Sequence, residues 1–323
     1  MKYGLPYKGN KSAIAAKIFN DLPRHLNFYD LFGGGGAMTH YALISGEYTS
    51  VHYNEINPLV ADFFKKALCG EYKDETRWIS RDDFYRLKDT DGFIKIVWSF
   101  GNDGKSYLYG KEIEPFKKAL HYAIVYGDYS LMKEYGLDLS PLDRYSTSSW
   151  NERRLYFIGE FIKTLPDVYK KGSHYYRDKF RLQHLNVQNV DCRIDTIEHL
   201  LSILNVQRLG YNKTPLPSIT STDYQRVSIL PDSILYCDIP YRNTSKYDSD
   251  FDYERFYDWA KTQKELVVVS EYNMPDNFIC IAEYDRTVTF SSTENGRKVK
   301  EKLFIPKHQK ELYENLMNEF RLF

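Results

Sequence analysis

Short apolar runs alternate with amphipathic segments at both ends of the chain, and this alternation predicts a parallel α/β sheet flanked by helices. In the first part, strands are predicted at residues 27–32 and 50–55, with helices at 37–44 and 58–68. In the last part, the pattern predicts strands at 233–238, 265–271 and 277–284, and helices at 252–263 and 308–320. A late hairpin is expected around Asn295-Gly296, because this pair favours tight turns between antiparallel strands.

Between these two parts the alternation stops. Residues 80–218 have a mixed, aromatic-rich sequence in which helices are expected at 113–126 and 153–165. We therefore predict one α/β domain, formed by residues 1–79 and 219–323, that is split by an inserted, mainly helical domain at 80–218. A domain inserted into another in this way is usually a recognition element.

Composition narrows the function classes. The 323 residues carry 44 basic and 44 acidic side chains, so a surface for nucleic acid would have to be a local patch. The four cysteines form no Cys-x-x-Cys pair, which argues against a disulfide framework or a zinc site. No run approaches the roughly 18 apolar residues of a membrane span, and no apolar signal core is present. We expect a cytoplasmic protein without a metal.

A run of four glycines, residues 33–36, joins the first predicted strand to its helix. Glycine allows the backbone to turn sharply and to approach a ligand closely. The run lacks the Gly-Lys-Ser/Thr ending of a nucleotide-triphosphate loop. Glu55 ends the second strand about 20 residues further on, where a carboxylate can accept hydrogen bonds from a ribose. A plain turn and a solvated glutamate are the alternatives.

The segment 238–241, Asp-Ile-Pro-Tyr, follows a buried apolar run. Ligands of α/β proteins bind at the carboxyl ends of parallel strands. There, the Asp238 carboxylate and the Ile239 carbonyl, freed from pairing by Pro240, could accept both hydrogens of an exocyclic amine. Tyr241 offers a flat face for stacking a base. Proline and aspartate also favour ordinary turns, so a simple strand-to-loop connection is the alternative.

Together these motifs resemble those of the Dam-type, alpha-group N6-adenine DNA methyltransferases of bacteria and phages. That family combines an aromatic–Gly–Asn–Lys motif, D/E-x-F-x-G-x-G, an acidic residue after the second strand, and D-P-P-Y. This chain has YKGNK at 7–11, DLFGGGG at 30–36, NEIN around Glu55 and DIPY at 238–241. The order of the motifs is also similar. The resemblance covers about residues 1–79 and 219–323, and the insertion matches only by its position.

The resemblance implies a Rossmann-like methyltransferase fold that uses S-adenosylmethionine. It implies site-specific methylation of a flipped-out adenine in duplex DNA, without a metal or a covalent intermediate. Lys11 is expected near the carboxylate of the cofactor's methionine part, and Asp223 near its adenine. The implied cofactor-binding residues are Tyr7, Lys11, Asp30, Phe32, Gly33, Gly34, Gly35, Gly36, Glu55, Asp223 and Asp238. The implied catalytic residues are Asp238, Ile239, Pro240 and Tyr241.

Two features depart from the family pattern. Ile239 replaces the first proline of D-P-P-Y, and four successive glycines stand where two are typical. The role of the replaced proline is a backbone carbonyl, which isoleucine also provides. Neither departure removes a functional group, so we expect activity to be retained.

Basic residues gather in the insertion, with eight Lys or Arg against four acids between residues 150 and 182, interleaved with aromatic rings. This composition suits phosphate contacts together with stacking. The predicted DNA-binding residues are Arg153, Arg154, Lys170, Lys171, Arg177, Lys179, Arg181 and, near the C-terminal hairpin, Lys298. We expect double-stranded DNA as the partner and a monomer as the active form, with a weak dimer as the alternative.

Other functions stay open at this point. Cytosine N4 methylation uses a similar geometry, although that family usually has Ser at the position of Asp238. Cytosine C5 methylation requires a Pro-Cys pair, and no cysteine of this chain follows a proline. An RNA or protein-glutamine methyltransferase is a further rival, although the glutamine enzymes usually have Asn at that position. A catalytically silent DNA-binding module of the same fold is the rival from another class.

Overall fold

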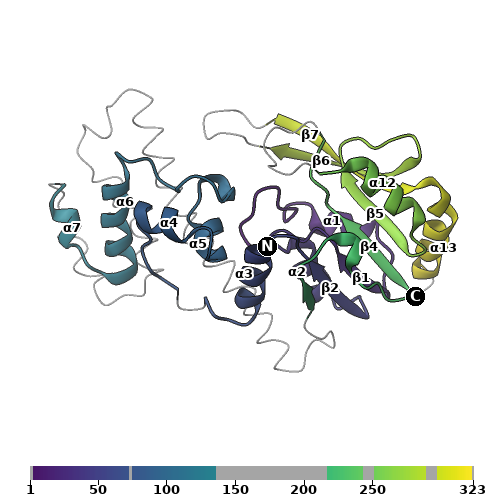
Figure 1. The fold of residues 1–323 in the computed structure, drawn as a ribbon, viewed down its shortest axis with the longest axis horizontal. Helices are drawn as coiled ribbons and strands as arrows, with labels where there is room; N and C mark the ends of the chain where they lie inside the picture. The colour runs from purple at the N-terminus through teal and green to yellow at the C-terminus, as the bar shows by residue number, and fades with distance from the viewer. Residues whose placement is uncertain (1–2, 73–74, 136–216, 243–250, 289–296, 322–323) are drawn as a thin grey trace. The chain divides into compact units, whose positions relative to one another are not determined.

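The computed structural model describes residues 3–72, 75–135, 217–242, 251–288 and 297–321. The chain divides into two compact units, of which unit 1 is Met1–Lys73 with Thr196–Phe323 and unit 2 is Asp74–Asp195 (Figure 1). The predicted domain boundaries lie after residues 79 and 218, and both compact-unit boundaries fall earlier in the chain. The recognition role of the insertion stays a prediction.

Seven strands of the described residues form one sheet in unit 1, in the order β3-β2-β1-β4-β5-β7-β6. Strands β1 to β5 pair in parallel, whereas β7 runs antiparallel to both β5 and β6. This sheet confirms the predicted Rossmann-like α/β fold. The strands are β1 (Asn27–Asp30), β2 (Ser50–Asn54), β3 (Ser218–Thr220), β4 (Ser233–Cys237), β5 (Leu266–Glu271), β6 (Phe278–Val288) and β7 (Arg297–Pro306).

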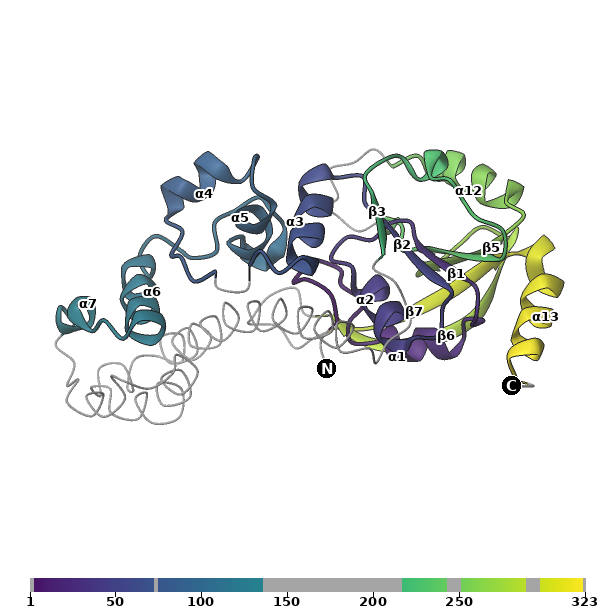
Figure 2. The ribbon, with the colours of Figure 1, turned by 90° about the horizontal axis from the view of Figure 1, so that it is seen from below.

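Helices pack on both faces of the sheet. Strand β4 is buried along its whole length, as expected for a central strand of a parallel sheet. Because successive side chains of a strand point to opposite faces, Ile234 and Tyr236 enter one core and Leu235 and Cys237 the other. Helices α1 (Ala15–Asn20), α2 (Ala37–Ser45) and α13 (Lys310–Arg321) contribute to the first core, and α12 (Tyr253–Thr262) to the second. Figure 2 shows α12 and the pair α1 and α2 on opposite sides of the sheet.

Several predicted elements have the observed bounds or nearly so. Helix α3 (Pro58–Leu68) coincides with the prediction, because Asn57 caps its N-terminus and Pro58 suits its first position. Strands β6 and β7 pair from Phe278–Pro306 to Val288–Arg297, which confirms the predicted antiparallel hairpin. The turn at Asn295-Gly296 lies outside the described residues. The prediction missed β3, which has only three residues.

Unit 2 is helical in the part that the structure describes. The predicted helix at 113–126 is present as α6 (Glu114–His121), which continues into a π-helical turn (Tyr122–Tyr126). Three short helices that the prediction missed are α4 (Arg81–Leu87), α5 (Gly92–Val97) and α7 (Ser130–Lys133). The predicted helix at 153–165 lies outside the described residues. No described helix of either unit combines the length and apolar character needed to cross a bilayer.

Candidate active site

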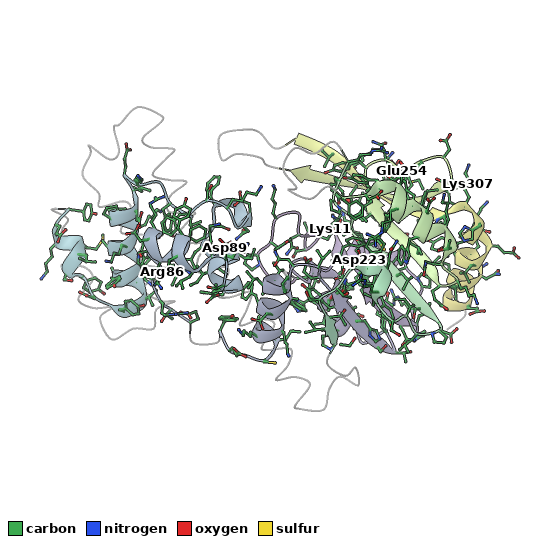
Figure 3. All side chains as sticks on the ribbon, in the orientation of Figure 1. Lys11, Arg86, Asp89, Asp223, Glu254 and Lys307 are labelled. Atoms are coloured by element: carbon green, nitrogen blue, oxygen red, sulfur yellow. The ribbon has the colours of Figure 1, made fainter. Side chains whose placement is uncertain are left out.

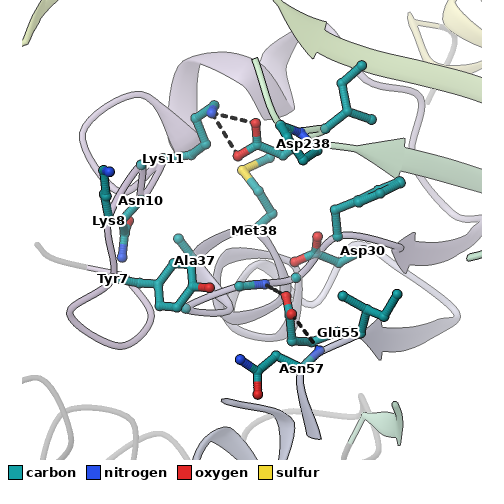
Figure 4. Close-up of a pocket in the computed structure, with 18 of the residues that line it drawn as sticks. Tyr7, Lys8, Asn10, Lys11, Asp30, Ala37, Met38, Glu55, Asn57 and Asp238 are labelled. Atoms are coloured by element: carbon teal, nitrogen blue, oxygen red, sulfur yellow. Dashed lines mark hydrogen bonds and ion pairs between the residues drawn. The ribbon is translucent and has the colours of Figure 1, made fainter. Parts of the chain in front are cut away.

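A pocket opens in unit 1 where β1, β2 and β4 end (Figure 4). From β1, the sheet continues through β2 and β3 on one side and through β4 and β5 on the other, so the order of the strands switches between β1 and β4. Ligands of open α/β sheets bind at such a switch point. Every predicted cofactor-binding or catalytic residue lines this pocket except Gly36 and Asp223. The lining residues are Tyr7, Lys8, Gly9, Asn10, Lys11, Asp30, Phe32, Gly33, Gly34, Gly35, Ala37, Met38, Glu55, Ile56, Asn57, Asp238, Ile239, Pro240 and Tyr241.

Close packing against aromatic rings explains why residues in this run are glycines. A Cβ atom on Gly33 would lie 2.2 Å from the Tyr53 ring, and a Cβ atom on Gly36 would lie 2.2 Å from the Phe64 ring. Gly36 also has a φ of 70°, which side-chain-bearing residues rarely adopt. Gly36 therefore shapes the start of α2 without lining the pocket. Gly33 and Gly36 therefore both have a steric reason, and the run is more than a flexible turn.

Tyr7 lies against the pocket side of the same run. A Cβ atom on Gly34 would come within 3.0 Å of the Tyr7 ring, and one on Gly35 within 2.6 Å of the Tyr7 Cβ atom. The backbone amide of Leu5 also donates to the carbonyl of Gly35 at 2.6 Å. Tyr7 of the N-terminal motif and the glycine run thus form one wall of the pocket. Binding of a cofactor by this wall stays a prediction.

Glu55 is held by two backbone amides. Its carboxylate accepts hydrogen bonds from the amides of Gly34 and Asn57, both at 2.9 Å (Figure 4). Burial raises the pKa of Glu55, and these two hydrogen bonds oppose the rise. The next residue, Ile56, lines the pocket with 67% of its surface exposed. Our sequence reasoning missed Ile56, although an isoleucine directly after the acidic residue of NEIN was a visible signal.

Asp30, at the end of β1, is a buried carboxyl group on the pocket floor. It accepts hydrogen bonds from the backbone amide of Thr39 at 3.2 Å and from its hydroxyl at 2.8 Å. Burial raises the pKa of Asp30 to about 7, and the negative charges of Asp238 and Glu55 add to this rise. Asp30 therefore binds a proton readily near neutral pH, unlike an ordinary aspartate.

Lys11 contacts Asp238 across the pocket from Glu55. The Lys11 ammonium lies 2.6 Å from Oδ1 and 2.7 Å from Oδ2 of the Asp238 carboxylate (Figure 4). It also donates a hydrogen bond to the Tyr241 hydroxyl. The ammonium lies 4.7 Å from the centre of the Tyr241 ring. The two paired residues are 227 positions apart, which is why our reasoning from motifs missed the pair. The expected contact of Lys11 with a cofactor carboxylate stays a prediction.

The remaining residues of the DIPY segment are fixed by packing. The Ile239 side chain is buried in the second core, so an apolar residue in place of proline has a packing role here. The Pro240 carbonyl accepts a hydrogen bond from the Tyr253 hydroxyl at 2.9 Å. The Tyr241 hydroxyl donates to Glu301 on β7, a buried carboxylate that no motif had indicated.

Asp223 has a local role in the structure. Its side chain accepts a hydrogen bond from the Gln225 amide at 2.9 Å and forms an ion pair with Arg255 of α12 at 3.1 Å. It does not belong to the described pocket lining, although Figure 3 shows it in the same unit as Lys11. The contact of Asp223 with the cofactor adenine stays a prediction.

Seven of the eight predicted DNA-binding residues belong to the insertion. Residues Arg153, Arg154, Lys170, Lys171, Arg177, Lys179 and Arg181 lie outside the described residues. Lys298 lies on β7, but its side chain is outside the described part as well. Among the described residues, no group of three or more His, Cys, Asp or Glu is arranged to hold a metal ion.

Comparison with known proteins identifies the family of the chain. The family model of D12 class N6 adenine-specific DNA methyltransferases matches residues 7–184, which is more than half of the chain. The protein therefore belongs to this family, of which Dam-type enzymes are members, and the predicted resemblance is confirmed. The match includes the N-terminal motif, the glycine run and Glu55, and it ends before Asp238. A search of curated proteins finds no match.

Proposed function

We propose that this protein transfers a methyl group from S-adenosylmethionine to N6 of an adenine flipped out of duplex DNA at a specific sequence. Family membership supports the methylation of adenine in DNA. The observation that carries the proposal is the position of Asp238, which shares one pocket with the glycine run and Glu55. The carboxylate proposed for the target amine thus shares a pocket with the wall proposed for the cofactor.

The residues present fit the cofactor. The pocket lies beside Gly33, Gly34 and Gly35, and Glu55 retains oxygen lone pairs for the ribose hydroxyls. The exposed Ile56 side chain beside Glu55 offers an apolar surface for the cofactor adenine. S-adenosylmethionine would supply a methyl group that its sulfonium charge activates for direct displacement.

The other half of the pocket would act on the target base. The lone pair of adenine N6 is delocalised into the ring, so this nitrogen is a weak nucleophile. The Asp238 carboxylate and the Ile239 carbonyl would accept its two N–H groups and draw the nitrogen toward a tetrahedral shape. Positioning and charge placement then supply the rate enhancement, and Asp238 is suited to receive the proton that N6 releases.

Tyr241 and Lys11 would support this step. The Lys11 ammonium compensates the negative charge of Asp238, which is only partly exposed to solvent. The tethered hydroxyl of Tyr241 holds its ring at the pocket edge, where it can stack on an extruded base. The inserted domain, with its basic residues, would hold and read the duplex.

The test is methylation of DNA by the purified protein with S-adenosylmethionine carrying a deuterated methyl group. Mass spectrometry of the digested nucleosides is expected to show labelled N6-methyladenine, and long-read sequencing would then map its sequence context. Labelled N4-methylcytosine, or label only in added RNA, would favour the rival reactions. No transfer to any nucleic acid would contradict the proposal.

Asp238→Ala tests the role of the central carboxylate. We expect methyl transfer to fall by about a thousandfold or more, because the target amine loses its principal acceptor. The rise in melting temperature with S-adenosylmethionine is expected to persist, since the glycine wall and Glu55 are unchanged. Wild-type turnover in this variant would show that the assignment of Asp238 is wrong.

A further inference from the structure

Glu301 is a carboxylate with no exposed surface, inside the sheet of unit 1. It lies on β7, opposite Tyr284 of β6, and it does not belong to the described lining of the pocket. A buried carboxylate is unfavourable unless donors surround it, so its neighbours indicate why the position carries a charge.

Three donors from separate parts of the chain converge on one oxygen of Glu301. The Ser270 hydroxyl of β5 donates to Oε1 at 2.8 Å, and the Tyr241 hydroxyl donates to the same atom. The Lys11 ammonium lies 3.7 Å from it. Two of these three donors, Tyr241 and Lys11, belong to the site proposed to hold the target base. A role of Glu301 in the stability of the sheet alone would not explain these two contacts.

The Tyr241 hydroxyl has one hydrogen and two carboxylates within reach. The Asp238 Oδ1 atom is 3.3 Å from the hydroxyl oxygen, whereas Glu301 makes the closer contact. By taking this hydrogen, Glu301 leaves a lone pair of Asp238 available to an incoming amine. Glu301 also gives Lys11 a second anionic neighbour, so the ammonium can stay buried when the substrate engages Asp238.

We propose that Glu301 is a positioning residue for methyl transfer, which acts by holding the Tyr241 hydroxyl and the Lys11 ammonium. This inference rests on the function proposed above. Through Tyr241 it sets the orientation of the stacking ring, and through Lys11 it sets the position of the cation beside Asp238.

Glu301→Gln tests the proposal, because it keeps the shape and removes the charge. We expect kcat to fall by about 10- to 100-fold, by analogy with the range known for residues that orient metal ligands. The KM for S-adenosylmethionine and the melting-temperature rise that it causes are expected to stay unchanged. The exposed Glu311 of α13 provides the matched control, and Glu311→Gln is expected to keep wild-type kinetics.

Tyr241→Phe separates positioning from general stability, because it keeps the ring and removes only the hydroxyl. If Glu301 acts through this hydroxyl, Tyr241→Phe also lowers kcat, and the double variant loses clearly less than the product of the two single losses. Fully multiplicative losses in the double variant, or a raised KM for the cofactor, would overturn the proposal.

The outcomes distinguish this inference from the proposed function. An active wild-type enzyme with an equally active Glu301→Gln variant overturns only the role of Glu301. A wild-type enzyme that transfers no methyl group to DNA overturns both. If Glu301→Gln fails to fold, Tyr241→Phe decides alone, since wild-type turnover without the hydroxyl would remove the link on which the role of Glu301 depends.

Discussion

Each unit contains a lysine that is almost completely buried, and the two lysines have opposite surroundings. Lys11 of unit 1 has 3% of its surface exposed and forms an ion pair with Asp238. Lys117, on α6 of unit 2, has 1% exposed and no hydrogen-bond partner among the described residues. Its ammonium lies 5.9 Å from the centre of the Tyr109 ring.

Burial alone therefore does not identify a functional charge. Desolvation lowers the pKa of Lys117 to about 7, so this side chain is largely neutral in mildly basic solution and behaves as packing. The same environment lowers the pKa of His121, one turn further along, to about 4. Around Lys11, by contrast, carboxylates converge from other elements of unit 1. A buried charge therefore indicates a functional site only where groups of opposite charge surround it.

The sharpest test of this contrast is the same substitution at each lysine, and the larger effect is expected at the first. Lys11→Met leaves Asp238 and Glu301 without their shared cation. We expect it to lower the free energy of unfolding by about 3–5 kcal/mol, the usual penalty for breaking a buried pair. Methyl transfer is expected to fall at least about 100-fold. Urea unfolding and a labelled-methyl assay measure the two effects.

The exposed Lys17 of α1 provides the control for this test. Lys17→Met is expected to change the free energy of unfolding by less than about 0.5 kcal/mol. A Lys11→Met variant as stable and active as this control would show that the pair with Asp238 has no energetic role.

Lys117→Met is expected to stabilise the protein, by about 2–4 kcal/mol at pH 7 and below. The native pKa of Lys117 is about 7, below its ordinary value of 10.5, so the unfolded chain binds more protons between these pH values. Stability of the wild type should therefore rise with pH from about 7 to about 10.5. The advantage of the variant should shrink over the same range, which urea unfolding at several pH values can follow.

If Lys117→Met destabilises the protein at pH 6, then Lys117 has a partner role, and the contrast with Lys11 fails. Methyl transfer by this variant is expected to remain at the wild-type level, because the substitution lies in the core of unit 2.

Asp30 extends the comparison to a buried carboxyl group, with a smaller expected effect. Its native pKa of about 7 lies above the ordinary 3.8, so the native state binds more protons between these values. Stability should therefore fall as the pH rises from about 4 to about 7. Asp30→Asn removes this ionisation, and we expect it to be more stable than the wild type by about 1–3 kcal/mol at pH 8 and nearly equal at pH 4. Parallel stability curves for the two proteins would contradict the raised pKa.

Local patterns predicted most of the sheet and the outline of the pocket. The start of α3 follows from Asn57 and Pro58, because asparagine favours the cap position of a helix and proline its first position. Local patterns did not indicate partners that lie far along the chain. The ion pair of Asp223 with Arg255 of α12 is one example, and the contact of Asp223 with a cofactor stays a prediction.

The sequence by itself determined the alternation of strands and helices, the glycine run and the order of the motifs, and thereby the family. These features depend on backbone geometry and on neighbours a few residues apart. Only the tertiary structure decided which buried charges meet. Asp238 and Glu301 come together because β4, β5 and β7 lie side by side in the sheet. Lys11, which precedes α1 in the chain, contacts both carboxylates. The energy of a buried charge depends on distance and desolvation, and neither can be read from separation along the chain.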